Sequence, residues 1–211
     1  MIKALKNPNT QRWIAPLILV AMSFGSNNSL AAGDIEAGKA EAAACFGCHG
    51  ADGKGLTPEQ PNLAGQNASY LAKQLQDYQS GNRVNPIMQG MSAALSPEKI
   101  ENISAYFESL PPVDGIAAEE DLQLGTDIYR GGILSAGIPA CAGCHGANGN
   151  GNPAAAWPAL SGQKDTYTKI QLEAFRSKQR ANDPNAMMRS IAERLTDAEI
   201  KAVSNYIMGL H

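Results

Sequence analysis

Residues 45–50 read CFGCHG and residues 141–146 read CAGCHG, so one short pattern occurs twice in this chain of 211 residues. The two copies contain all four cysteines and two of the three histidines. In each copy two cysteines lie three residues apart, which places both on one side of a helical turn, and a histidine follows directly. Cys-x-x-Cys-His is the attachment signature of c-type haem.

The duplicated motif therefore predicts two covalently bound haem c groups. Each sulfur would form a thioether to one haem vinyl group, and each imidazole would be a proximal iron ligand. The predicted attachment residues and proximal ligands are Cys45, Cys48, Cys141, Cys144, His49 and His145. A structural zinc site would join its cysteine pairs over about 12 to 20 residues, not over the 96 residues that separate these copies. A thioredoxin-like pair would need a βαβ context and leaves the two histidines unexplained.

The first 31 residues predict a cleavable signal peptide and therefore a periplasmic protein. Three basic residues precede an apolar run over residues 13–25, and small residues at positions 29 and 31 suit a signal peptidase. The apolar run is shorter than the about 20 residues that cross a bilayer, although an uncleaved membrane anchor is an alternative interpretation. Cleavage would change the net charge from −3 to −6, because this segment holds three basic and no acidic residues.

The sequence on either side of the motifs repeats one order of elements, which predicts an all-α fold with two similar domains. We place an N-terminal domain at 32–110, a linker at 111–118 and a C-terminal domain at 119–211. Helices are expected over residues 34–44, 69–80, 97–110 and 122–131, with a last helix that starts after a cap at Thr196. Gly38 and Gly125 interrupt the opening helices, which indicates close packing against another helix.

Four methionines in two equivalent loops are candidates for the second axial ligand of each iron. Met88 lies eight residues before Ser96, and Met188 lies eight residues before Thr196, the predicted caps of the closing helices. We predict that Met88 and Met188 are the ligands because this register is duplicated. Met91 and Met187 do not share the register, and thioether side chains also fill gaps in cores. We interpret these two as packing residues.

Six further residues could support the haem groups. Pro61 and Pro158 follow the two histidines by 12 and 13 residues, and their carbonyls could accept the free imidazole N–H, although simple turn prolines would show the same spacing. Four residues could donate hydrogen bonds to haem propionates, although they could equally be core tyrosines and surface arginines: Tyr70, Tyr167, Arg83 and Arg180. The third histidine, His211, is interpreted as part of a solvated tail.

With these features in place, the chain closely resembles the dihaem cytochrome c4 family, a tandem of class I c-type cytochromes. The resemblance is carried by the second haem motif with the sequence before it, residues 130–132 and 139–145, by the turn at 63–66 and by the closing segment 206–210. It implies two all-α domains related by a pseudo-twofold axis, with haem propionates facing each other near the interface. It also implies His49–Met88 and His145–Met188 coordination, with Pro61 and Pro158 orienting the histidines. One departure is visible: the segment from Arg180 to Met188 is three residues longer than that from Arg83 to Met88.

Two protein ligands on each iron leave no site for a substrate, so the predicted function is electron transfer and not enzyme catalysis. The resemblance implies a shuttle from a quinol-oxidising cytochrome complex or a small redox protein, such as a copper protein, to a terminal oxidase. No nucleic-acid partner is expected, and peripheral association with the membrane is compatible with the sequence. Two alternatives are a dihaem peroxidase, which needs an open iron, and a dihaem subunit of a larger oxidoreductase such as a flavocytochrome sulfide dehydrogenase.

Overall fold

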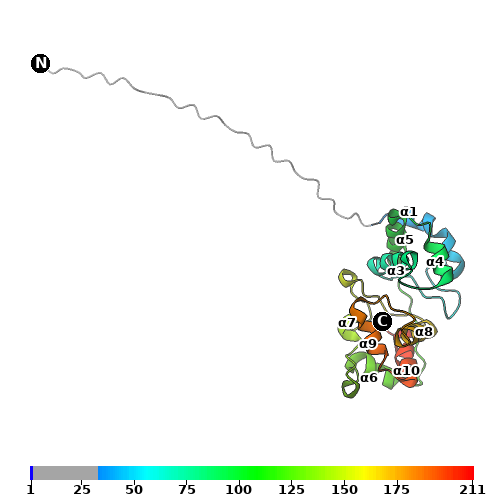
Figure 1. The fold of residues 1–211 in the computed structure, drawn as a ribbon, viewed down its shortest axis with the longest axis vertical. Coiled ribbons are helices and arrows are strands. Elements are labelled where there is room, and N and C mark those ends of the chain that lie inside the picture. Colours follow the sequence, from blue (N-terminus) through cyan, green and yellow to red (C-terminus); the bar gives the residue numbers. More distant parts are fainter. Residues whose placement is uncertain (2–32) are drawn as a thin grey trace. The chain divides into compact units, whose positions relative to one another are not determined.

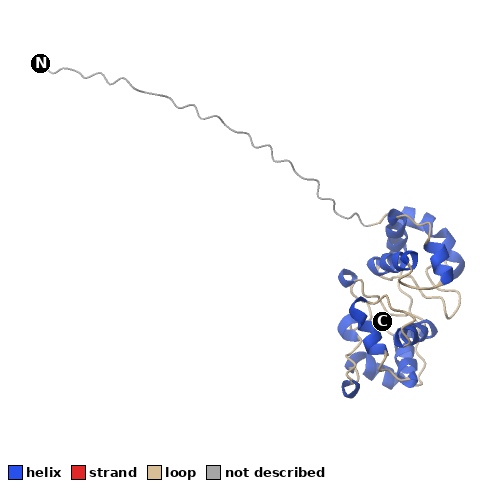
Figure 2. Ribbon diagram, viewed as in Figure 1, coloured by secondary structure: helices blue, strands red, loops and turns tan. Residues whose placement is uncertain are grey.

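The computed structural model describes Met1 and residues 33–211 (Figure 1). The predicted signal peptide falls on residues 1–31 and, apart from Met1, lies outside the described residues. Within the described part every regular element is a helix (Figure 2), and the only ladder pairings are two isolated bridges, Ile133–Ile138 and Asn152–Trp157. The all-α prediction is confirmed. No helix among the described residues is both long and apolar enough to cross a membrane.

The same order of main helices occurs in both halves of the described chain. The first half contains α1 (Ile35–Glu41), η1 (Ala42–Cys45), α2 (Phe46–His49), α3 (Ala68–Ser80), α4 (Pro86–Ser92) and α5 (Pro97–Ser109). The second half contains α6 (Leu122–Gly131), η2 (Leu134–Ala136), α7 (Ala142–His145), η3 (Pro153–Ala155), α8 (Asp165–Arg176), η4 (Pro184–Ala186), α9 (Met187–Ala192) and α10 (Asp197–Met208). Residues 111–118 between them have no regular secondary structure, and the exact domain boundaries stay a prediction.

Side-chain caps start the helices that frame each half. The side chain of Asp34 accepts a hydrogen bond from the amide of Ala37 at the start of α1. Ser96 caps α5 in the same way, and Thr196 forms a reciprocal capping box with Glu199 at the start of α10. Each cap satisfies amide groups that have no partner inside the helix. The predicted starts of these helices are confirmed.

The opening helix of each half packs against the closing helix, and a glycine of the opening helix lies at the contact. A Cβ atom on Gly38 would overlap the backbone carbonyl of Asn102 in α5, and one on Gly125 would overlap that of Ala202 in α10. Both contacts would fall well below the 3.0 Å that real Cβ atoms keep. The predicted close packing at both glycines is therefore confirmed, and it lets the helix backbones approach directly.

Each half has its own hydrophobic core, and each core holds one Cys-x-x-Cys-His turn in place. In the first half Cys45 and Phe46 pack against a cluster that includes Tyr106 and Phe107 of α5. In the second half Cys141 and Ala142 pack against a cluster of six buried residues from α6, α10 and the segment after α10, namely Ile128, Tyr129, Val203, Tyr206, Ile207 and Leu210. The motif turn of each half thus packs against the closing helix of that half.

The segments expected to be loops around the methionines are short helices, so that part of the prediction was wrong. Asn85 caps α4 by accepting a hydrogen bond from the amide of Met88 at 3.0 Å, and Pro86 occupies the first helical position. Proline is common in loops, but a proline in the first turn favours a helix because its missing N–H is not needed there. In the second half, Asn185 and Ala186 have left-handed φ values of 53° and 56° directly before α9.

Candidate haem sites

Each Cys-x-x-Cys-His motif forms one helical turn that ends at its histidine. α2 ends at His49 and α7 ends at His145. The next residues, Gly50 and Gly146, have φ values of 70° and 84°, a conformation that glycine adopts without strain. The chain therefore leaves the helix directly after the histidine, and the loop that follows returns to the imidazole ring.

That returning loop places a proline carbonyl beside each imidazole. The Nδ1 atom of His49 lies 3.1 Å from the carbonyl oxygen of Pro61, and Nδ1 of His145 lies 3.0 Å from that of Pro158. Since a carbonyl can only accept, Nδ1 carries the proton and donates it. The Nε2 atom of each ring is then the unprotonated nitrogen, which is the form that binds a metal.

Burial shifts the pKa of both imidazoles and of the first cysteine in each motif. Both histidines are 8% exposed. Their burial lowers the pKa of His49 and of His145, against the opposing effect of the bonds to the proline carbonyls. Neutral imidazole is therefore favoured at neutral pH, as metal ligation requires. Burial also raises the pKa of the Cys141 thiol to about 11, and burial together with neighbouring Cys48 raises that of Cys45.

The chemistry of this donor set fits c-type haem. In each half, two cysteine thiols and one imidazole with an available Nε2 lie within five residues that form a single turn. Among the described residues, no group of three or more His, Cys, Asp or Glu side chains is arranged to hold a metal ion by itself. Thiols for the vinyl groups and nitrogen for the iron suit a haem better than a bare metal ion.

The four methionines lie on α4 and α9 and differ in exposure. Met88 and Met188, the two in equal register, are partly buried. Met91 and Met187 are 42% and 37% exposed. Met91 and Met187 are thus more exposed than the other two methionines, and their role as packing residues stays a prediction. The partly buried pair is the one that shares the register of the helix caps.

The two tyrosines and two arginines form a reciprocal network that joins the halves. Arg83 donates to Tyr167 at 3.0 Å and to Gln171 at 2.7 Å. Arg180 donates to Tyr70 at 2.9 Å and to Gln74 at 3.1 Å. Both guanidinium groups are buried, with 7% and 8% exposure. The equivalence of the two sets of bonds is what a pseudo-twofold relation between the halves produces.

Sequence analysis did not single out the amide side chains that complete this network. Gln74 and Gln171 each accept from both arginines, and Asn182 donates to Gln74 at 2.8 Å. The signal was present, because Gln74 and Gln171 occupy matching positions of the two repeats. A polar residue repeated on the inner side of an amphipathic helix indicates a buried hydrogen bond.

Comparison with known proteins agrees with this geometry. The Cytochrome c family model matches the chain twice, at residues 35–111 and 133–211. Cytochrome c4 of Azotobacter vinelandii is 44% identical over 191 residues, which cover 86% of this chain and 91% of the relative. The chain belongs to the cytochrome c4 family. Its two family domains and its two Cys-x-x-Cys-His turns mean that it carries two covalent haem c groups and is a dihaem electron-transfer cytochrome.

Two further relatives extend the comparison. The crystal structure of reduced recombinant cytochrome c4 from Pseudomonas stutzeri superposes with a TM-score of 0.83 at 44% identity, covering 85% of this chain and all of that one. A protein named thiosulfate dehydrogenase electron acceptor, from Stutzerimonas stutzeri strain A1501, is 42% identical over 169 residues and covers 78% of each chain. Both relatives are redox proteins by name, so redox proteins are the partners to be expected.

Proposed function

We propose that this protein is a periplasmic carrier without enzyme activity, which takes single electrons from a respiratory donor and passes them to a terminal oxidase. The observation that carries the proposal is the duplicated ligand set. In each half a buried histidine with a free Nε2 and a partly buried methionine in equal register are available to one iron. Signal-like residues 1–31 support export.

In this proposal the irons are coordinated by His49 with Met88 and by His145 with Met188. The four cysteines hold the haem groups through thioether bonds. Pro61 and Pro158 orient the imidazoles, as the hydrogen-bond distances to their carbonyls suggest. When bound, each haem supplies one reversible electron, and its two protein ligands exclude water and small molecules from the iron. Electron transfer through the haem edge is then the reaction that remains.

The buried arginines are proposed to hold the haem propionates. Arg83 and Arg180 form no ion pair within residues 33–211, because their acceptors are amide and phenol oxygens. Two buried positive charges without a negative partner are unfavourable. Propionate carboxylates at the junction of the two halves would supply that negative charge and complete the hydrogen bonds.

Replacing Arg83 with methionine should therefore lower the reduction potential of at least one haem. A nearby positive charge favours the reduced haem, which carries one positive charge less than the oxidised form. We expect a change in the redox equilibrium of about tenfold, equal to about 59 mV for one electron. Potentiometric titration measures it. Arg194→Met is the control, because Arg194 is exposed and its one acceptor among residues 33–211 is the carbonyl of Gly137. Equal shifts in both variants would contradict the proposal.

The carrier proposal is tested by spectra of both the oxidised and the reduced protein. We expect two haems per chain, a methionine-to-iron band from each in the oxidised state, and no binding of carbon monoxide to the native reduced protein. Carbon monoxide binding or turnover of peroxide would instead indicate an open iron and a dihaem peroxidase. Purification as a lone chain that passes electrons to an oxidase would speak against a subunit of a larger oxidoreductase.

A second candidate donor follows from the relative named thiosulfate dehydrogenase electron acceptor. Stopped-flow mixing of the oxidised cytochrome with a thiosulfate dehydrogenase and thiosulfate tests this assignment. Reduction that saturates with cytochrome concentration would support it. Reduction no faster than with thiosulfate alone would leave a quinol-oxidising complex or a copper protein as the proposed donor.

A further inference from the structure

The peptide group that follows each of the two prolines has a hydrogen-bond partner on both sides. The carbonyl of Pro61 faces Nδ1 of His49, and the N–H of the same peptide, on Asn62, donates to Oε1 of Gln163 at 2.9 Å. Gln163 belongs to the other half of the protein. A single peptide group therefore connects the first histidine to a side chain of the second half.

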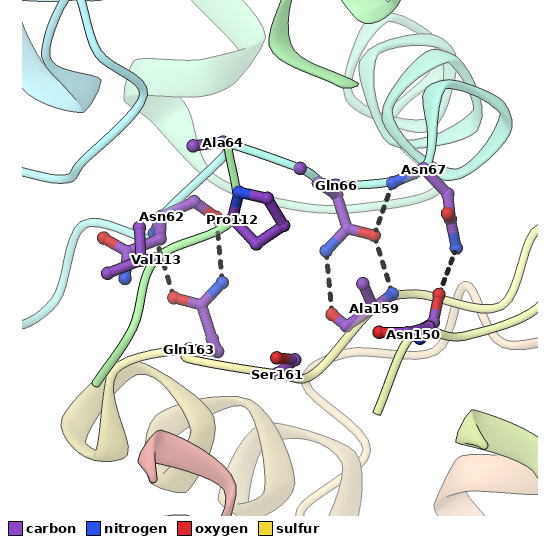
Figure 3. Close-up of a pocket in the computed structure, with 11 residues that line it drawn as sticks. Asn62, Ala64, Gln66, Asn67, Pro112, Val113, Asn150, Ala159, Ser161 and Gln163 are labelled. Carbon is purple, nitrogen blue, oxygen red and sulfur yellow. Dashed lines mark hydrogen bonds between the residues drawn. The ribbon is translucent and has the colours of Figure 1, made fainter. Parts of the chain in front are cut away.

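The second half repeats this arrangement in the opposite direction. The carbonyl of Pro158 faces Nδ1 of His145, and the N–H of that peptide, on Ala159, donates to Oε1 of Gln66 at 2.8 Å. Figure 3 shows both glutamines reaching across the junction to the backbone of the facing segment. Each histidine is thus linked to a glutamine that its own half does not provide.

The orientation of both glutamine amides is fixed by their partners. Nε2 of Gln163 donates to the carbonyl of Asn62, and Nε2 of Gln66 donates to that of Ala159, each at 2.9 Å. Each Oε1 also accepts the N–H of the next residue in its own chain segment, Lys164 at 3.1 Å or Asn67 at 3.0 Å. A flipped amide would place its NH₂ group against two N–H donors. Oε1 is therefore the atom that faces each proline peptide.

The link from Asn62 to Gln163 is buried and that from Ala159 to Gln66 is partly buried, so both can act electrostatically. Gln66 and Gln163 are 6% and 8% exposed, and Asn62 is 8% exposed. In such surroundings hydrogen bonds in a chain polarise one another. An acceptor on the N–H side of a peptide increases the negative charge on its carbonyl oxygen. That oxygen then accepts more strongly from the imidazole, which raises the basicity of the nitrogen that faces the metal.

We infer that Gln163 and Gln66 are positioning residues that strengthen the hydrogen bond of the axial histidine in the opposite domain. Gln163 acts on His49 through the Pro61 peptide, and Gln66 acts on His145 through the Pro158 peptide. The inference rests on the proposed coordination of the irons by His49 and His145. A more basic imidazole stabilises the oxidised iron, so each glutamine lowers the reduction potential of the haem in the other half. The interface thereby makes each haem's potential depend on the docking of the two domains.

Replacing Gln163 with methionine, which has a similar length and no amide, tests the crossed assignment. We expect the reduction potential of the haem attached at Cys45 and Cys48 to rise by about 59 mV, a tenfold shift of its redox equilibrium toward the reduced form. The potential of the other haem should stay nearly unchanged. The N–H proton on Nδ1 of His49 should exchange with solvent about fivefold faster. Redox titration followed by NMR of the two sets of haem methyl signals reports both haems separately. Gln66→Met should give the mirror result.

Two variants separate this effect from a loosened interface. Ser69→Ala removes another hydrogen bond between the halves, from Oγ to the carbonyl of Pro153 at 2.7 Å. It leaves the peptides after Pro61 and Pro158 unchanged. It should leave both potentials and both exchange rates unchanged. Gln163→Asn keeps a polar amide but is too short to reach Asn62, so it should reproduce the crossed shift if the methionine variant does not fold.

The inference and the proposed function fail in different ways. A shift confined to the haem of the same half as the substituted glutamine, equal shifts in both haems, or a Ser69→Ala effect of the same size would overturn the inference and leave the ligand assignment intact. Absence of the methionine-to-iron bands from the unmodified protein would count against the proposed coordination itself.

Discussion

Replacing Met88 with alanine is expected to abolish the methionine-to-iron band of one haem and to lower the potential of that haem by more than about 59 mV, a tenfold change for one electron. A thioether ligand favours reduced iron and raises the potential of a haem whose other ligand is histidine. Without it, water can reach the iron and stabilise the oxidised state. The oxidised-state spectrum and a redox titration measure both effects.

The protein contains matched controls for this substitution. Met91 lies on the same helix, α4, but is exposed, so Met91→Ala should keep both bands and both potentials. Met188→Ala should affect the second haem as Met88→Ala affects the first, with Met187→Ala as its control. A band that survives in Met88→Ala, or that is lost in Met91→Ala, would contradict the assignment and leave that iron with a different sixth ligand.

Replacing Gly38 with alanine is expected to destabilise the protein by at least about 3 kcal/mol. The added methyl group would overlap the backbone carbonyl of Asn102, and Cβ of Tyr106 lies 3.0 Å away, so no side-chain rotation can relieve the clash. α1 and α5 would have to separate, and the motif turn that packs on α5 would lose its support. Guanidinium unfolding of the haem-loaded protein, followed by circular dichroism, measures the change.

Gly90→Ala is the control for this prediction. A Cβ on Gly90 in α4 would meet no atom within 4 Å, and alanine in a helix is favoured over glycine by about 0.5 to 1 kcal/mol. The variant should be as stable as the parent or slightly more stable. Gly125→Ala should resemble Gly38→Ala, because its Cβ would overlap the carbonyl of Ala202. Equal unfolding midpoints for Gly38→Ala and Gly90→Ala would contradict the role of Gly38 in the close contact between α1 and α5.

Much of the fold could be predicted from local sequence signals. Cys-x-x-Cys-His fixes the chemistry within five residues, and its repetition predicts two haem groups and two similar halves. Ser96 and Thr196 predicted the starts of α5 and α10 because an N-cap satisfies amides only three residues away. The first methionine segment is a helix and not the expected loop, because proline occurs both in loops and at helix starts, and the cap formed by Asn85 distinguishes the two here.

The sequence by itself determined the cofactor, the all-α class and the duplication, because each is encoded by residues that are near neighbours in the chain. The tertiary structure decided which residues meet at the junction of the halves. Arg83 contacts Gln171 and Asn62 contacts Gln163 across about ninety to one hundred residues. No periodicity predicts such pairs, because the partners are backbone groups and amides whose positions depend on how two finished domains dock. The haem motif can therefore be recognised from the sequence, whereas the side chains linked to its histidines across the interface are known only from the tertiary structure.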